Sequence, residues 1–200
     1  VLIIIGILLG AILKGADLIN SAKQKKFYNS FVRSWEITVE NYYDRTGNLL
    51  GDGTDNGGTG SPDGKFDNVT GSTFSNSGGI DDILKRVGLT PPTTNTSQSG
   101  QYKFTGHYSG SQTITLYLDY KHSDKDDTYY NTLYFTAVPT DLAVALDKII
   151  DGKANANEGK FRRYPDNTTN PGYVGNWPSA DPKQDFSEKT VNTMLIVDLP

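Results

Sequence analysis

Residues 1–13 read VLIIIGILLGAIL, and this run decides how the rest of the chain is interpreted. It holds no charged residue, and no later stretch is comparably apolar. A helix that spans a bilayer needs roughly 20 apolar residues, so the run is shorter than one span. No basic stretch precedes it, as one would precede the apolar region of a signal peptide. We therefore expect these residues to be the later part of a longer apolar helix.

The same helix is predicted to continue well past Leu13. Residues 14–45 contain no proline and a single glycine, Gly15. Apolar side chains recur there at spacings of three and four, the pattern of one buried helix face: Tyr28, Phe31, Val32, Trp35, Val39 and Tyr42. Gly47 is a suitable C-terminal stop. The sequence therefore predicts one helix of about 45 residues, roughly 68 Å long at 1.5 Å per residue.

The rest of the chain predicts an antiparallel β-sheet with long polar loops. Residues 112–122 alternate between apolar and polar side chains, which is typical of a half-buried strand. Further strands are predicted at 101–108, 128–138 and 191–199, and two short helices at 79–88 and 140–152.

The predicted fold class is therefore α+β, with a long N-terminal α-helix packed on an antiparallel β-sheet head with long loops and two short helices. We expect residues 1–27 to form an exposed helix half, which serves as membrane segment and filament core. Residues 28–200 are expected to form the globular head, including the amphipathic helix half.

Composition and motifs exclude several functional classes. The net charge of −4 argues against a nucleic-acid partner, which usually meets a basic surface. The chain has no cysteine, so disulfides, thiolate metal sites and cysteine nucleophiles are excluded. His107 and His122 are the only histidines, and neither lies in a His-Glu-x-x-His run. There is also no Gly-x-Ser-x-Gly elbow and no phosphate-binding Gly-x-x-x-x-Gly-Lys loop, so we expect no enzymatic activity.

Several segments resemble one protein family. Residues 3–23, IIIGILLGAILKGADLINSAK, resemble the N-terminal helix of type IV pilins and type II secretion pseudopilins. The resemblance continues through residues 40–52, ENYYDRTGNLLGD, and returns in residues 146–161, LDKIIDGKANANEGKF. Residues 193–199, TMLIVDL, are similar to the final strand of the family. The family's mature N-terminus, a proline in the second half of the helix and a C-terminal cysteine pair are all absent.

The resemblance implies a structural subunit, or major pilin, of an extracellular type IV pilus-like filament. It implies synthesis in the inner membrane, leader removal and methylation by prepilin peptidase, and export by a pilus assembly machinery. The principal partner would be other copies of the chain, in contact through the apolar residues Val1, Leu2, Ile3, Ile4, Ile5, Ile7, Leu8, Leu9, Ile12 and Leu13. A secretion pseudopilin or an adhesive minor pilin remains an alternative, because one scaffold serves all three.

A calcium site is predicted in the loop that follows the long helix. Residues 52–63 read DGTDNGGTGSPD, which partly match a twelve-residue calcium loop. Crowded carboxylates repel unless a cation or solvent separates them, and calcium accepts six to eight oxygen ligands. The candidate ligands are Asp52, Asp55, Asn56, Asp63 and Asp67. A solvated turn rich in Asp, Asn and Gly is the alternative.

Glycosylation is a further prediction for the surface loops. Asn68, Asn95 and Asn167 each begin an Asn-x-Ser/Thr pattern. Chance matches are expected in a chain so rich in these residues, and O-linked sugar on the same loops is an alternative.

Overall fold

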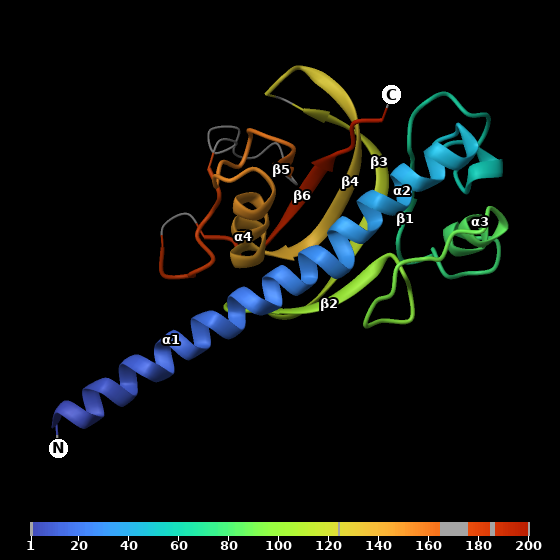
Figure 1. Cartoon of the computed structure of the whole chain (residues 1–200). Coiled ribbons are helices and arrows are strands. Elements are labelled where there is room, and N and C mark those ends of the chain that lie inside the picture. Colours follow the sequence, from blue (N-terminus) through green and yellow to red (C-terminus); the bar gives the residue numbers. More distant parts are fainter. Residues whose placement is uncertain (1, 124, 165–175, 185–186, 200) are drawn as a thin grey trace.

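The computed structural model describes residues 2–123, 125–164, 176–184 and 187–199, with side chains from Lys14 onward. The chain is α+β (Figure 1). The helices are α1 (Leu2–Phe27), α2 (Arg33–Thr46), α3 (Ile80–Arg86) and α4 (Thr140–Ile150). The strands are β1 (Asp67–Thr70), β2 (Gln101–Gly106), β3 (Gly110–Ser123), β4 (Thr128–Pro139), β5 (Phe161–Tyr164) and β6 (Thr190–Ile196).

The prediction of one long N-terminal α-helix packed on the sheet is wrong. A π-helical turn at Tyr28–Val32 separates α1 from α2. The two α-helices are therefore 26 and 14 residues long, in place of one regular helix of about 45 residues.

Local hydrogen bonding and the spacing of aromatic residues account for the π-helical turn. The Ser34 hydroxyl donates to the carbonyl of Asn29, five residues earlier, at 3.0 Å. Such side-chain bonds compete with the regular helical ladder. Phe27, Phe31 and Trp35 follow one another at steps of four, which drift around a helix of 3.6 residues per turn. A wider turn reverses this drift, and all three side chains stay buried.

Among the described residues, the sheet contains six antiparallel strands in the order β1-β3-β4-β6-β5, and β2 also pairs with β3. The long β3–β4 pairing sets Leu116 opposite Phe135 and Leu118 opposite Leu133. Because side chains alternate across a strand, these four apolar residues line one face of the sheet. Strands β1 and β5 were not predicted.

The hydrophobic core lies between that face of the sheet and the helices (Figure 1). Phe31 of the π-helical turn packs against Phe135 of β4, with ring centroids 6.2 Å apart. Trp35 of α2 and Leu142 of α4 are fully buried in the same cluster. α2 ends as predicted at Gly47, whose φ of 69° is the left-handed conformation that glycine adopts readily.

Candidate functional site

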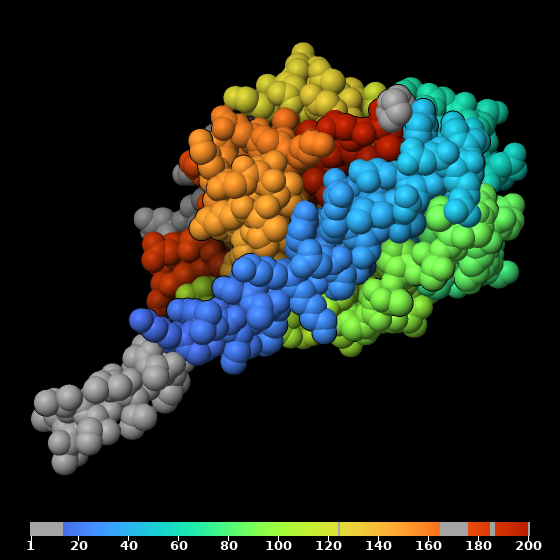
Figure 2. Space-filling model, in the orientation of Figure 1, coloured from blue at the N-terminus to red at the C-terminus, as the bar shows by residue number. Residues whose placement is uncertain are grey.

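The first candidate site is the exposed segment of α1, residues 14–26, part of which lies beside β2 and α4 (Figure 1, Figure 2). Every described side chain from Lys14 to Lys26 is exposed or half-buried, and burial begins at Phe27. Leu18 is 72% exposed and Ile19 is 58% exposed. These are the two most exposed large apolar side chains among the described residues. Leu18 and Ile19 follow the apolar run of residues 1–13 on the same helix, so we treat this segment as a candidate contact surface.

The residues predicted to drive polymerisation lie outside those whose side chains are described: Val1, Leu2, Ile3, Ile4, Ile5, Ile7, Leu8, Leu9, Ile12 and Leu13. From residue 2 onward their backbone belongs to α1. Within the described part of the chain, no helix combines the length and the apolar character needed to cross a bilayer.

The second candidate site is the aspartate loop, which we define as residues 52–67, between α2 and β1. It brings together three of the five predicted calcium ligands. Carboxylate oxygens of Asp52, Asp63 and Asp67 lie within 4.8 Å of one another. Asp52 is buried, Asp67 is half-buried and Asp63 is exposed. The sequence therefore predicted a carboxylate cluster that is present, and its two most favoured ligands, Asp52 and Asp63, both belong to that cluster.

Backbone N–H groups already bind the two less exposed carboxylates. Asp52 Oδ1 accepts from the N–H of Asp63 and Asp52 Oδ2 from that of Gly64, both at 2.9 Å. Asp67 Oδ2 accepts from the N–H groups of Gly53, at 2.8 Å, and Thr59, at 2.7 Å. These bonds hold the loop, together with Phe66, which is buried in the hydrophobic core.

The other two predicted ligands lie apart from this cluster. Asn56 Oδ1 accepts a hydrogen bond from the buried Tyr42 hydroxyl at 2.8 Å, and Asn56 Nδ2 donates to the carbonyl of Asp52 at 2.8 Å. Burial, the main cause, raises the pKa of Tyr42, so this hydroxyl stays protonated as a donor. Asp55 is exposed and is not a member of the cluster.

The donor set suits a loop held by hydrogen bonds better than a calcium ion. Calcium requires six to eight oxygen ligands. Both Asp52 oxygens and one Asp67 oxygen already accept backbone donors. Asp63 forms an ion pair with Lys65 at 3.1 Å, which raises the pKa of that lysine. Calcium binding here remains a prediction, and a cation would have to compete with these donors.

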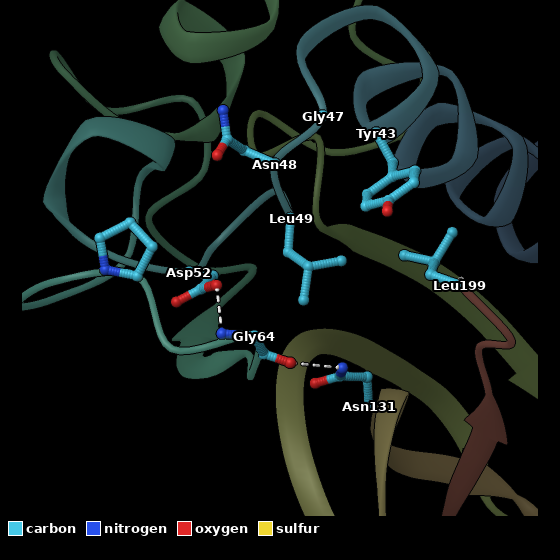
Figure 3. A pocket seen from close by; sticks show the side chains of 9 residues that line it. Tyr43, Gly47, Asn48, Leu49, Asp52, Gly64, Asn131 and Leu199 are labelled. Atoms are coloured by element: carbon cyan, nitrogen blue, oxygen red, sulfur yellow. Dashed lines mark hydrogen bonds between the residues drawn. The ribbon is translucent and has the colours of Figure 1, made fainter.

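A groove of about 340 Å³ borders the aspartate loop (Figure 3). Tyr43 of α2, Leu49 and Leu199 form its apolar side, and Asp52 lies on the other side. The Asn131 amide of β4 donates to the carbonyl of Gly64 at 3.0 Å, so the sheet helps to fix the loop. The polar groups of Asp52 and Asn131 that line the groove therefore already form hydrogen bonds within the chain.

The predicted glycosylation positions differ in their surroundings. Asn68 is exposed on β1, with a positive φ of 55°. Asn95 is also exposed, but its amide pairs with the backbone of Lys103 on β2, donating at 2.8 Å and accepting at 2.7 Å. Asn167 lies outside the described residues. Glycosylation stays a prediction, and Asn68 is the less constrained of the two described positions.

Two carboxyl groups that sequence reasoning did not select lie together at the end of α4. Asp147 is fully buried, and Asp151 follows it by four residues. The available signal was an acidic residue inside an apolar helix face, directly after Leu146. That pattern is unusual, because a lone buried carboxylate is unfavourable.

The chain was compared with protein-family models, with curated proteins and with solved structures, and none of these matches it. The likeness to pilins therefore depends on the sequence segments quoted above.

Proposed function

We propose that the chain is a structural subunit of a type IV pilus-like filament that polymerises through α1. The observation that carries this proposal is the exposure of Leu18 and Ile19 in the segment of α1 at residues 14–26. Full burial of each side chain against another copy would contribute roughly 1.5–3 kcal/mol. The apolar run at residues 1–13 continues the same helix and adds to that surface.

Charge distribution supports a second copy of the chain as the partner. Residues 1–27 contain four lysines and one aspartate, so they carry a net charge of +3. The whole chain carries −4, which leaves −7 on residues 28–200. The positively charged residues 1–27 of one copy are thus electrostatically complementary to the negatively charged head of another.

Contact between α1 and a neighbouring head joins two different surfaces. Such a heterologous contact repeats from copy to copy and gives an open helical filament when its rotation does not close. The charge distribution is consistent with such a polymer, although a reciprocal two-fold dimer would also place each α1 on the head of the other copy.

The pilin resemblance extends this proposal to the life of the subunit. The chain would begin in the inner membrane, be processed by prepilin peptidase and be incorporated by an assembly machinery into a filament outside the cell. In this proposal the chain has no catalytic role.

Replacing both exposed α1 residues, as Leu18→Asp with Ile19→Asp, is expected to abolish filaments. Two charged side chains would have to be desolvated in each contact between subunits. Filaments of the full chain would be counted by negative-stain electron microscopy and quantified by sedimentation. Because both positions are exposed, the unfolding midpoint of the head should change little.

Tyr129→Ser is a matched control, because Tyr129 is a large side chain on the head and is 55% exposed. This variant should form filaments as the wild-type chain does. Wild-type amounts of filament from the double α1 variant would contradict the proposal.

Reversing the lysine cluster, as Lys23→Glu, Lys25→Glu and Lys26→Glu together, is expected to weaken assembly and to reverse its response to salt. Raising ionic strength from about 0.01 M to about 1 M shortens the Debye length from roughly 30 Å to 3 Å. Wild-type polymer should therefore decrease with salt, while the variant should recover. Sedimentation across a salt series measures both, and equal salt responses would exclude charge complementarity.

A further inference from the structure

A pair of carboxyl groups, the buried Asp147 and the half-buried Asp151, connects α4 to the segments that follow it. Asp147 lies in the last turn of α4, and Asp151 is the residue that caps that helix. A separation of four residues places the two side chains on the same side of a helix. Asp147 has no solvent-exposed surface. Asp151 contributes to the raised pKa of Asp147 through its charge and through hydrogen bonding between the two carboxyl groups, which therefore lie close together.

Three of the four oxygens in this pair accept identified hydrogen bonds. Asp147 Oδ2 accepts from the N–H of Asn155 at 2.7 Å and from Trp177 Nε1 at 2.6 Å. Asp151 Oδ1 accepts from the N–H of Lys160 at 3.0 Å, and Oδ2 from that of Phe161 at 2.8 Å. The pair therefore joins α4 to the following loop, to β5 and to the segment that carries Trp177.

The fourth oxygen, Asp147 Oδ1, is buried and has no hydrogen-bond donor among the described residues. A buried acceptor without a donor is unfavourable by about 1–3 kcal/mol, and more so if it is charged. A second carboxylate in contact makes ionisation of both groups harder still. A proton on Asp147 Oδ1, donated to Asp151, removes both problems together.

Among the ion pairs of the described residues, none includes Asp147 or Asp151. Arg163 of β5 is paired with Glu188, and Lys160 is paired with Asp198. Lys148, on α4 itself, is exposed. Burial is the largest influence on Asp147 and raises its pKa from 3.8 to about 6, and Asp151 acts in the same direction. The hydrogen bonds from Trp177 and Asn155 oppose this rise.

We propose that Asp147 and Asp151 form a site that binds one shared proton. The protonated pair holds the α4–β5 connection and the Trp177 indole in place. On loss of the proton, the pair carries two negative charges, one on the fully buried Asp147 and one on the half-buried Asp151. Repulsion between them weakens the bonds to Asn155 and to the indole. The α4–β5 connection and Trp177 are therefore held firmly in mildly acidic solution and more weakly above neutrality.

The direction of the stability change follows from the raised pKa. Between about pH 4 and pH 6 the folded chain holds a proton that the unfolded chain has released, so stability falls as pH rises through this range. The proton contributes its full stabilisation of the folded chain below pH 3.8, the ordinary pKa of aspartate. The equilibrium between folded and unfolded chain should change by about a hundredfold across the interval.

The neutral analogue Asp147→Asn provides a direct comparison. Its amide N–H would donate to Asp151 as the shared proton does. Its carbonyl oxygen would still accept from Asn155 and Trp177. The variant should keep its hydrogen bonds to Asn155 and Trp177 at every pH, because the amide does not titrate.

The indole N–H of Trp177 reports on the site by nuclear magnetic resonance of the ¹⁵N-labelled full chain, kept monomeric in detergent with a chelator. The chain has two tryptophans. Trp35, which donates to the carbonyl of Ser99, is an internal reference. The Trp177 resonance should titrate with a midpoint near pH 6 while that of Trp35 does not. In Asp147→Asn the Trp177 titration should vanish, whereas Asp141→Asn at the start of α4 should leave it intact.

Three outcomes would overturn the proposal. The Trp177 resonance could stay constant from about pH 4.5 to about pH 8, a window that brackets the expected transition. Its titration could persist in Asp147→Asn. Calcium chloride added in place of the chelator could abolish the titration, which would make the pair a cation site.

Discussion

Replacing Trp35 with alanine is expected to lower the free energy of unfolding by about 3–5 kcal/mol. The Trp35 side chain has no exposed surface, and its ring meets Phe74 edge-on with centroids 5.0 Å apart. Its indole N–H also donates to the buried carbonyl of Ser99 at 3.0 Å. The variant would therefore leave both a cavity and an unpaired carbonyl, whose effects add.

Two companion variants separate these contributions in urea unfolding experiments. Trp35→Phe keeps much of the packing but removes the hydrogen bond, so its effect should be intermediate. Ile37→Ala changes a residue of α2 that is 39% exposed and should lower stability by less than about 1 kcal/mol. If Trp35→Ala were no more destabilising than Ile37→Ala, the core would not depend on α2 in this way.

The sequence was sufficient to predict the elements whose patterns are local. Alternating side chains in β3 and the glycine after Thr46 are each determined by a few neighbouring residues. The π-helical turn could not be predicted in this way. The π-helical turn depends on how the aromatic side chains of the helix pack against the sheet. Helical periodicity alone favours one regular helix.

Strands β1 and β5 were missed because pairing, and not intrinsic pattern, determines them. Each has four residues, and their sequences DNVT and FRRY show no clear alternation. β1 joins the edge of β3 across a register shift at Asp67, while β5 pairs with β6. Such short strands depend on tertiary context more than on propensity.

The candidate sites also combine features that the sequence predicts with features that only the folded chain determines. Charge and composition predicted an aspartate cluster, but the backbone of the loop decides which carboxylates meet. Gly58 illustrates this, because a Cβ there would overlap the carbonyl of Gly51 and the carboxylate of Asp67. The Asp147–Asp151 pair lies in the segment quoted for its resemblance to pilins, but only the structure shows that Asp147 is buried with an oxygen that has no donor among the described residues.

Asp52→Ala is expected to lower the free energy of unfolding by about 2–4 kcal/mol, even when a chelator is present. Asp52 is 3% exposed and holds the N–H groups of Asp63 and Gly64. Its removal would leave both donors without their charged acceptor and would release the aspartate loop from the groove beside Tyr43. Chemical unfolding of the full chain in detergent measures the loss, and Asp52→Asn, which keeps one strong acceptor, should lose less.

Asp55→Ala is the matched control, because Asp55 lies in the same loop but is exposed. Its stability should stay within about 0.5 kcal/mol of wild type. Repeating the series in calcium distinguishes the two origins of loop order. A bound ion adds RT ln(1 + [L]/Kd), or roughly 4 kcal/mol at a thousandfold excess over Kd, to the wild-type chain but not to Asp52→Ala. Loop order from backbone hydrogen bonds alone predicts the same difference between wild type and Asp52→Ala with and without calcium. An Asp52→Ala chain as stable as wild type in chelator would refute the role assigned to this carboxylate.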